Sequence, residues 1–214
     1  MPVLAYCIAE AQSNISIPNA GVRGAPIARV LAGPLQGFVS EFDRSVVKGL
    51  SSREAALEFH RTIQELFRQV AVVPFRFPTV LATEQEILVH MSEHASEYAS
   101  TLSRLRNSVQ MEIRIGKNAR DGEPAESGAK YLQQKQHDCA RLKASAADFR
   151  QASEPWLKHW RQREVSHGLH CYLLIPREAV GQFLIGIKKI VLPNNQSASV
   201  SGPWPATEFF EVKE

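Results

Sequence analysis

Short apolar runs and longer apolar stripes alternate along the first half of the chain. The runs are typical of strands, and they lie at residues 3–9, 27–32, 35–42 and 71–77. Gly33 and Pro34 separate the second run from the third and predict a hairpin, because proline supplies the fixed φ of a turn. Pro74 falls inside the last run, which favours an edge strand or a bulge.

Two longer stretches repeat apolar residues at spacings of three and four, which predicts amphipathic helices. Ser51 with Glu54, and Thr83 with Glu86, have the spacing of capping boxes and predict where the two helices begin. The second helix is expected to run unbroken to Leu105. The stripe residues are Ala56, Phe59, Ile63, Leu66, Phe67 and Val70 in the first helix and Ile87, Met91, Ala95, Tyr98, Leu102 and Leu105 in the second.

The second half of the chain continues the alternation of strands and helices. Strands are predicted at residues 109–115, 169–175, 197–202 and 208–212. One helix carries the stripe Leu132, Cys139, Leu142, Ala146 and Phe149 and stops before Pro155, and another spans residues 177–192. Trp156, Leu157 and Trp160 suit one more short helical turn. Residues 116–127 are polar and contain several glycines, which indicates a loop or an insertion.

These elements lack the regular βαβ rhythm of a doubly wound sheet, which favours the α+β class. We expect two α+β domains, residues 1–107 and residues 108–214, divided after the second predicted helix. The second domain resembles a modified ferredoxin-like plan, in which two βα units share a sheet with rearranged strands.

The composition is that of an ordinary soluble globular protein, with 44% hydrophobic and 22% charged residues. A formal net charge of +3 is too small to indicate a nucleic-acid partner by itself. The first residues lack the basic segment of a signal peptide, and no run approaches the roughly 18 apolar residues that span a bilayer. Cys7, Cys139 and Cys171 are widely spaced, which predicts free thiols in a reducing, cytoplasmic setting.

The sharpest catalytic motif is His90-Met-Ser-Glu93-His94, which matches the H-x-x-E-H pattern of inverted zinc peptidases. On a helix the two histidines lie one turn apart and could share a zinc ion, with Glu93 as the general base. A zinc hydrolase also needs a third protein ligand, and no second motif points to one. We therefore favour a solvated helix face without a catalytic or metal role, and keep a zinc-dependent hydrolase as an alternative.

The other histidines and cysteines are weaker candidates. His167 and His170 could offer two metal ligands, but Cys171 faces the opposite side of a strand from His170 and a fourth partner is missing. His60 borders the buried face of its helix, as a core histidine, an interface residue or a catalytic base. Neither Cys139 nor Cys171 carries the mark of a reactive nucleophile.

Residues 141–163 contain six basic and two acidic residues, interleaved with Trp156 and Trp160. This pattern fits either a weak nucleic-acid-binding surface or a solvated helix face beside two core tryptophans, and we favour the helix face. The chain contains no glycine-rich phosphate-binding fingerprint, and we expect no cofactor.

Two stretches are distinctive when taken together. Leu57-Glu-Phe-His60 leads to Val72-Val-Pro74-Phe-Arg76-Phe77-Pro-Thr79-Val80, and the chain finishes with Ser201-Gly202-Pro203-Trp204-Pro205 followed by Phe209. They resemble the gas vesicle protein F/L family (GvpF/GvpL), whose members share a helix with a histidine, a "V-L-P-x-R-F-G-T" strand and turn, and a terminal "T-G-P-W-P-x-Y-x-F". Pro78, Ser201 and Thr207 depart from that pattern, because the family usually has Gly, Thr and Tyr at these places.

The resemblance implies a two-domain α+β protein with a ferredoxin-like C-terminal part and no catalysis. It also implies a cytoplasmic accessory protein that binds the gas vesicle shell protein and other accessory proteins during vesicle assembly. The motifs supply the structural or interaction candidates His60, Pro74, Arg76, Phe77, Thr79, Gly202, Pro203, Trp204, Pro205 and Phe209.

Two of these candidates carry structural expectations. Arg76 lies in an apolar strand, and if its side chain is buried we expect an acidic partner. The acidic candidates are Glu54, Glu58 and Glu84. Trp204 lies between two prolines that would form a rigid bend joining the last two strands. There the tryptophan either seals a core or forms part of a binding face.

Overall fold

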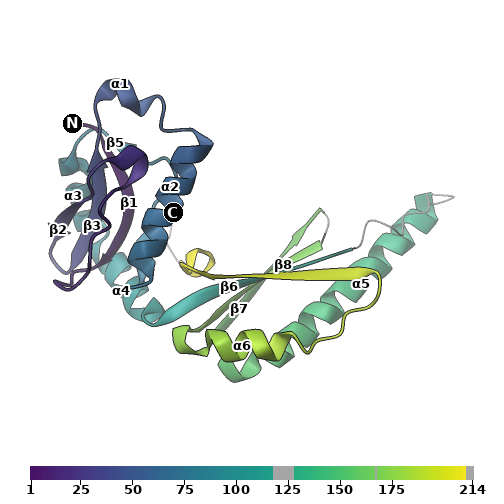
Figure 1. Cartoon of the computed structure of the whole chain (residues 1–214). Coiled ribbons are helices and arrows are strands. Elements are labelled where there is room, and N and C mark those ends of the chain that lie inside the picture. The colour runs from purple at the N-terminus through teal and green to yellow at the C-terminus, as the bar shows by residue number, and fades with distance from the viewer. Residues whose placement is uncertain (118–127, 167, 211–214) are drawn as a thin grey trace. The chain divides into compact units, whose positions relative to one another are not determined.

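The structure is a computed structural model that describes residues 1–117, 128–166 and 168–210 (Figure 1). The chain divides into two compact units: unit 1 combines Met1–Asn107 with the tail from Pro205, and unit 2 is Ser108–Trp204. The tail groups with unit 1, whereas the sequence analysis placed it in the second domain. Both units combine helices with antiparallel sheets, which is the expected α+β class.

Unit 1 is built on a five-stranded sheet that has β1 as an inner strand. The strands are β1 (Val3–Glu10), β2 (Ala28–Ala32), β3 (Leu35–Glu41), β4 (Val72–Pro74) and β5 (Val80–Leu81). Their order is β2-β3-β1-β4, β5 also pairs with β1, and every pairing is antiparallel. Residues 3–9 of β1 are fully buried. This burial on both faces of the strand explains why its sequence is continuously apolar.

The helices of unit 1 are α1 (Arg44–Val47), α2 (Arg53–Phe67), α3 (Glu84–Glu93) and α4 (Ala95–Leu105), with 3-10 turns at Val22–Gly24 and Thr207–Phe209. The long helix predicted after Thr83 is wrong, because the chain leaves the helical region at His94, with φ −106° and ψ 18°. Two shorter helices, α3 and α4, take its place. The strand predicted at 208–212 is also wrong where it is described, because Phe209 ends a 3-10 turn; residues 211 and 212 lie outside the described residues.

Both helix starts differ from the predicted capping boxes. The N-cap of α2 is Ser52, one residue later than predicted, and its hydroxyl accepts a hydrogen bond from the N–H of Ala55 at 3.2 Å. A box cannot form there, because Ala55 has no carboxylate to return the bond. At α3 the Thr83 side chain makes no capping bond. Glu86 instead accepts a hydrogen bond from the N–H of Ala82 at 2.9 Å.

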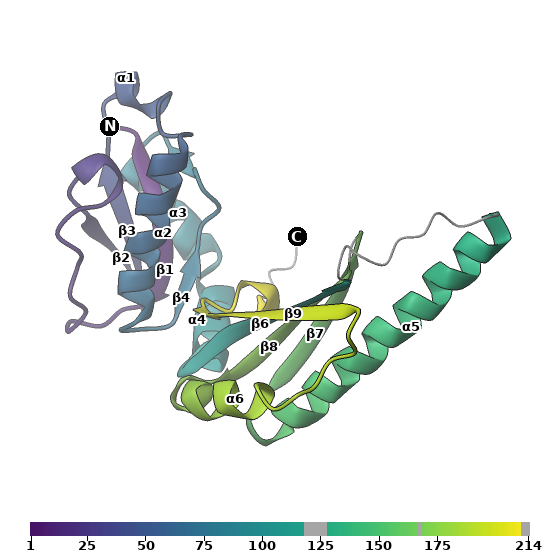
Figure 2. The same cartoon turned by 45° about the vertical axis from the view of Figure 1, so that its right-hand side comes forward.

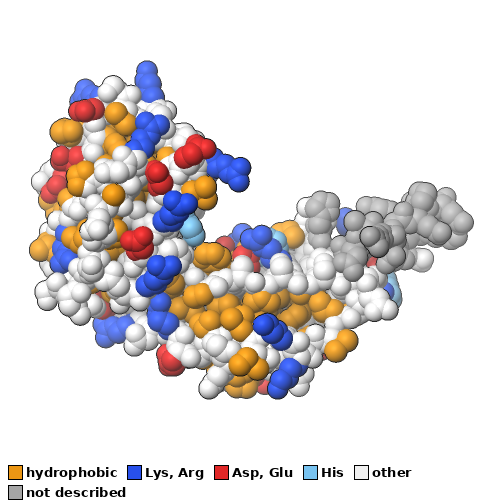
Figure 3. Space-filling view, in the orientation of Figure 1, with side chains coloured by type: hydrophobic (Ala, Val, Ile, Leu, Met, Phe, Trp, Pro, Cys, Tyr) orange, Lys and Arg blue, Asp and Glu red, His pale blue; other side chains and the backbone are white. Residues whose placement is uncertain are grey.

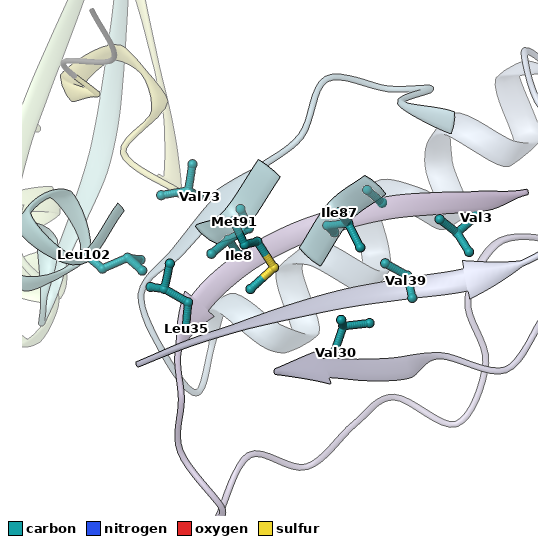
Figure 4. Close-up of a cluster of buried hydrophobic side chains, with 10 residues drawn as sticks. Val3, Ile8, Val30, Leu35, Val39, Val73, Ile87, Met91 and Leu102 are labelled. Carbon is teal, nitrogen blue, oxygen red and sulfur yellow. The ribbon is translucent and has the colours of Figure 1, made fainter. Parts of the chain in front are cut away.

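The main core of unit 1 lies between the sheet and the helices α3 and α4 (Figure 4). It joins Val3, Ala5, Ile8, Val30, Leu35, Val39 and Val73 from the strands to Ile87, Met91 and Leu102 from the helices. Helix α2 packs on the other side of the sheet (Figure 2). There the ring of Phe59 stacks on that of Tyr6, with 5.3 Å between the ring centroids.

Unit 2 has the strand order of a ferredoxin-like fold. Its strands are β6 (Ser108–Lys117), β7 (His159–Val165), β8 (Gly168–Pro176) and β9 (Gln196–Trp204). Helix α5 (Gly128–Ser153) lies between β6 and β7 in the chain, and α6 (Val180–Ile187) lies between β8 and β9. The sheet order β7-β8-β6-β9, with antiparallel neighbours throughout, makes β6 parallel to β7 and β8 parallel to β9. These are the two split βαβ units of that fold.

One face of this sheet is apolar, and α5 and α6 cover it (Figure 2). Alternate residues of β6, from Val109 to Ile115, are at most 2% exposed. This alternation is the half-buried pattern predicted for residues 109–115. The polar residues between them lie on the opposite face of the sheet.

Three predictions for unit 2 are wrong. Strand β7 went unpredicted because all of its side chains except that of Trp160 are exposed, so the sequence HWRQREV shows no apolar alternation. The helical turn predicted for Trp156, Leu157 and Trp160 is a 3-10 turn at Glu154–Trp156, and Trp160 lies on the strand instead. The helix predicted at 177–192 is shorter, a 3-10 turn at Arg177–Ala179 followed by α6. Leu132, placed in the buried stripe of α5, is 59% exposed. Most of the predicted loop, residues 118–127, lies outside the described residues.

Candidate functional site

The two histidines of the zinc-peptidase-like motif lie at the end of α3, with 4.8 Å between their ring centroids. Each has a protein partner. The Nε2 atom of His90 lies 2.7 Å from the hydroxyl of Tyr98, and the Nδ1 atom of His94 lies 3.3 Å from a carboxylate oxygen of Glu97. Burial and the neighbouring His94 hold the pKa of His90 below its usual value, with Glu93 acting against them.

Among the described residues, no three His, Cys, Asp or Glu side chains gather into a set that could hold a metal ion. The third ligand that a zinc hydrolase needs is therefore missing from this part of the chain. A shallow hollow of about 250 Å³ lies beside His90, lined by Thr83, Gln85, Glu86, Val89 and Glu93. Its volume is below the roughly 300–1,000 Å³ of typical ligand pockets.

In the described part of the chain, His170 and the buried cysteines do not form a reactive site either. His170 turns toward Glu112 on the polar face of the sheet, whereas Cys171 is buried on the other face, as the strand alternation predicts. Burial raises the pKa of Cys171 to about 11 and raises that of Cys7 still further. Both thiols are therefore protonated at neutral pH and are poor nucleophiles. His167 lies outside the described residues.

The first family motif forms the end of the sheet in unit 1. Pro74 is the last residue of β4 and lies opposite Cys7 of β1. The hydroxyl of Thr79 donates to the carbonyl of Arg76 at 2.6 Å, and the carbonyl of Thr79 accepts from the N–H of Ala5 at 3.0 Å. These bonds close the turn that follows β4 and attach it to β1, so this part of the motif stabilises the fold.

The charged and aromatic residues of this motif differ in their exposure. Arg76 is exposed, so the condition for a buried pair with Glu54, Glu58 or Glu84 does not arise. His60 is also exposed on α2, which excludes a core histidine. Phe77 packs inward, and its ring centroid lies 5.0 Å from that of Phe59.

The second motif is divided between the two units. Gly202, in β9 of unit 2, has φ +123°. A Cβ at this position would lie 2.8 Å from the carbonyl oxygen of Gln110 on the neighbouring strand. Only glycine fits such a backbone conformation and such a close approach. The glycine of the motif is therefore explained by the geometry of the strand pair β6–β9.

The aromatic residues of the second motif also take separate places. Trp204 ends β9, half-buried, and its Nε1 donates to the hydroxyl of Ser201 at 3.3 Å. Pro203 is exposed. In unit 1, Pro205 and Phe209 are buried, and the carbonyl of Phe209 accepts from Arg104 at 2.9 Å. The predicted rigid bend between two strands is thus the end of one strand followed by a 3-10 turn.

A polar cluster that the sequence analysis missed lies on the face of the unit 2 sheet that the helices leave open. Glu112 on β6 is only 8% exposed. It accepts two hydrogen bonds from Arg114, at 2.9 and 3.0 Å, lies 3.2 Å from the Nδ1 atom of His170, and accepts from Ser201 at 3.5 Å. A nearly buried carboxylate needs such partners. The alternation of β6 places Glu112 and Arg114 together. The other partners come from β8 and β9, which flank β6 in the sheet but lie far from it along the chain.

The basic residues between 141 and 163 do not form one helix face. Arg141 and Lys143 belong to α5, where they bind Asn195 at 2.9 Å and Glu164 at 2.7 Å. Arg161 and Arg163 belong to the strand β7. The stretch that suggested a nucleic-acid surface is therefore spread over different elements, and two of its cations are already bound to other side chains.

An exposed apolar surface of unit 2 lies on α6 and the segment after it. Phe183 and Ile187 face the sheet and are buried, whereas Ile185 is 64% exposed and Val191 is 90% exposed. Leu184 is half-buried, and Lys188 and Lys189 are exposed beside it. Hydrophobic side chains gather on this side of unit 2 around α6 and β9 (Figure 3). We call Leu184, Ile185, Lys188, Lys189 and Val191 the α6 surface.

In the part of the chain that the structure describes, no helix is both long and apolar enough to cross a bilayer.

Comparison with known proteins covers almost the whole chain. A family model described as gas vesicle synthesis protein GvpL/GvpF matches residues 2–211. The crystal structure of the gas vesicle protein GvpF from Anabaena sp. PCC7120 superposes with a TM-score of 0.84 at 12% identity, covering 100% of this chain and 97% of that one. GvpF from Microcystis aeruginosa gives a TM-score of 0.81 at 12% identity, covering 98% of each chain. No curated protein matches significantly. The chain belongs to the gas vesicle synthesis protein GvpL/GvpF family.

Proposed function

We propose that this protein is a non-enzymatic accessory factor for gas vesicle assembly, acting in the cytoplasm and at the growing vesicle. Its partners are the gas vesicle shell protein and other accessory proteins. The observation that carries the proposal is the family match over residues 2–211, which includes both motifs. The same fold in two gas vesicle proteins, over nearly the full length of each, supports it.

The polar clusters of the described residues are bound within the chain, and the exposed surfaces of that part suit binding. His90 and Glu112 are the centres of the two polar clusters that most resemble sites. The imidazole of His90 is engaged by Tyr98, and the carboxylate of Glu112 is engaged by Arg114 and His170. An assembly factor needs exposed contact surfaces, and the α6 surface is one.

The test is a gas vesicle gene cluster expressed in a host that makes no vesicles, with and without the gene for this protein. We expect vesicles, counted by electron microscopy, only when the gene is present. A tagged copy of the full chain should also retain the shell protein in a pull-down from the same cells. Normal vesicles without the gene, together with no retained shell protein, would contradict the proposal.

A further inference from the structure

Helix α6 is apolar on nearly every side, yet the fold covers only one side of it. Its sequence is VGQFLIGI, and the buried residues are Phe183 and Ile187. On the uncovered side Ile185 is 64% exposed, and Val191 in the segment that follows is 90% exposed. A helix that is hydrophobic all round is normally buried. An exposed apolar surface with a polar edge marks an interaction site, so α6 is partly covered by this chain and has room for a partner.

The two glycines of α6 have different surroundings, one on the covered side of the helix and one on the open side. Gly186 is required by the fold, because a Cβ there would lie 2.9 Å from the ring of Trp156. Gly181 is exposed, and a Cβ there would meet nothing within 4 Å. Packing within this chain does not explain Gly181, although glycine in a helix costs about 0.5–1 kcal/mol relative to alanine. A partner whose backbone comes close to α6 at this point would explain it.

The edge of the α6 surface is positively charged. Lys188 and Lys189 are exposed at the C-terminal end of the helix, and in the described part of the chain neither forms an ion pair. Complementary charge suppresses wrong partners and fixes the register of a contact. The surface therefore fits an apolar segment with carboxylates beside it.

We propose that the α6 surface is the docking site for an apolar segment of the gas vesicle shell subunit that carries acidic side chains at its edge. This assignment rests on the proposed function, because the shell subunit is the partner named there. The side chains of Ile185 and Val191 enter the contact, the lysines pair with the acidic groups, and Gly181 allows the close approach.

The experiment is a pull-down of the shell subunit by the tagged full chain, co-expressed in a host that makes no vesicles. The variants are Ile185→Asp, the double variant Lys188→Glu/Lys189→Glu, and Gly181→Ala. The matched control is Leu57→Asp on α2, which alters a leucine that is 49% exposed. We expect at least a tenfold loss of retained shell subunit for Ile185→Asp and for the double variant, and no loss for the control. Thermal unfolding of each variant shows that the fold is intact.

Gly181→Ala gives a readout that misfolding cannot imitate. It should raise the unfolding temperature and still lower shell retention several-fold. Wild-type retention should fall as salt rises, and that of the double variant should not.

The outcomes separate this assignment from the proposed function. If the wild type retains no shell subunit, the proposed function fails and the docking site fails with it. If the wild type retains the subunit and Ile185→Asp retains just as much, only the docking site is wrong. Two other results would also overturn it while leaving the shell partner in place. One is loss of self-association in Ile185→Asp, measured by light scattering, with shell retention unchanged. The other is loss of binding to phosphatidylserine vesicles in that variant, with shell retention unchanged.

Discussion

Replacing Gly202 by alanine tests whether the terminal motif is set by the geometry of the strand pair β6–β9. The backbone at Gly202 has φ +123°, a region open essentially to glycine alone. The new Cβ would lie 2.8 Å from the carbonyl oxygen of Gln110 and 2.9 Å from the sulfur of Met111. The methionine side chain can rotate away from the added methyl group. The carbonyl oxygen belongs to the neighbouring strand and cannot move without disturbing the ladder.

The two costs give the expected magnitude. A non-glycine residue in a sparsely populated backbone region costs about 1–3 kcal/mol. Forcing a methyl group into a packed contact costs about 1–3 kcal/mol more. We therefore expect Gly202→Ala to lower the free energy of unfolding by about 2–6 kcal/mol. For a chain of this size that corresponds to a fall in unfolding temperature of roughly 4–24 °C.

The matched control is the same substitution at Gly181, where a Cβ meets nothing within 4 Å. It should raise the free energy of unfolding by about 0.5–1 kcal/mol, because alanine favours the helix. Urea denaturation followed by circular dichroism measures both variants against the wild type. If Gly202→Ala stays within about 0.5 kcal/mol of the wild type, a usual bound for neutral surface changes, the steric argument is refuted.

Three further predictions concern unit 1. Tyr6→Phe should cost about 1–3 kcal/mol in urea denaturation, because the buried hydroxyl of Tyr6 accepts from the N–H of Val22 and donates to Ser40; an unchanged midpoint would contradict this. The pKa of His90 is lower in the folded chain, so its contribution to stability is complete above about pH 6.5 and is lost as the pH falls below that. His90→Gln should therefore make the fall in stability between pH 7.5 and 5.5 shallower, and an equal slope would count against the assignment. Arg76→Ala should change stability by less than about 0.5 kcal/mol, because Arg76 is exposed; a larger loss in thermal unfolding would show a partner for the guanidinium.

Local patterns of apolar residues predicted much of the fold, because they show which side of each segment packs against the core. The continuous apolar run of β1 and the alternation of β6 identified two inner strands, and the stripe on α2 identified the helix that packs against Tyr6. Strand β7 could not be predicted in this way, because all of its side chains except that of Trp160 are exposed, although its backbone pairs with β8. The helix break at His94 could also not be predicted from the sequence, because the apolar stripe continues across it from α3 into α4.

The candidate site depended more strongly on tertiary structure. The motifs were visible in the sequence, but only the structure shows that Arg76 is exposed and Trp204 half-buried, because exposure depends on which segments fold over them. The partners of Glu112 include His170 and Ser201, from strands far away in the chain.

The sequence by itself determined the class of fold, most of the strands and helices, and the family, because these follow from apolar periodicity and from motifs of neighbouring residues. Only the tertiary structure decided that the tail from Pro205 joins unit 1, that Gly202 faces the carbonyl of Gln110, and that one side of α6 is left uncovered. The physical reason is that periodicity shows which side of a segment is apolar, whereas the packing of distant segments decides whether that side is covered.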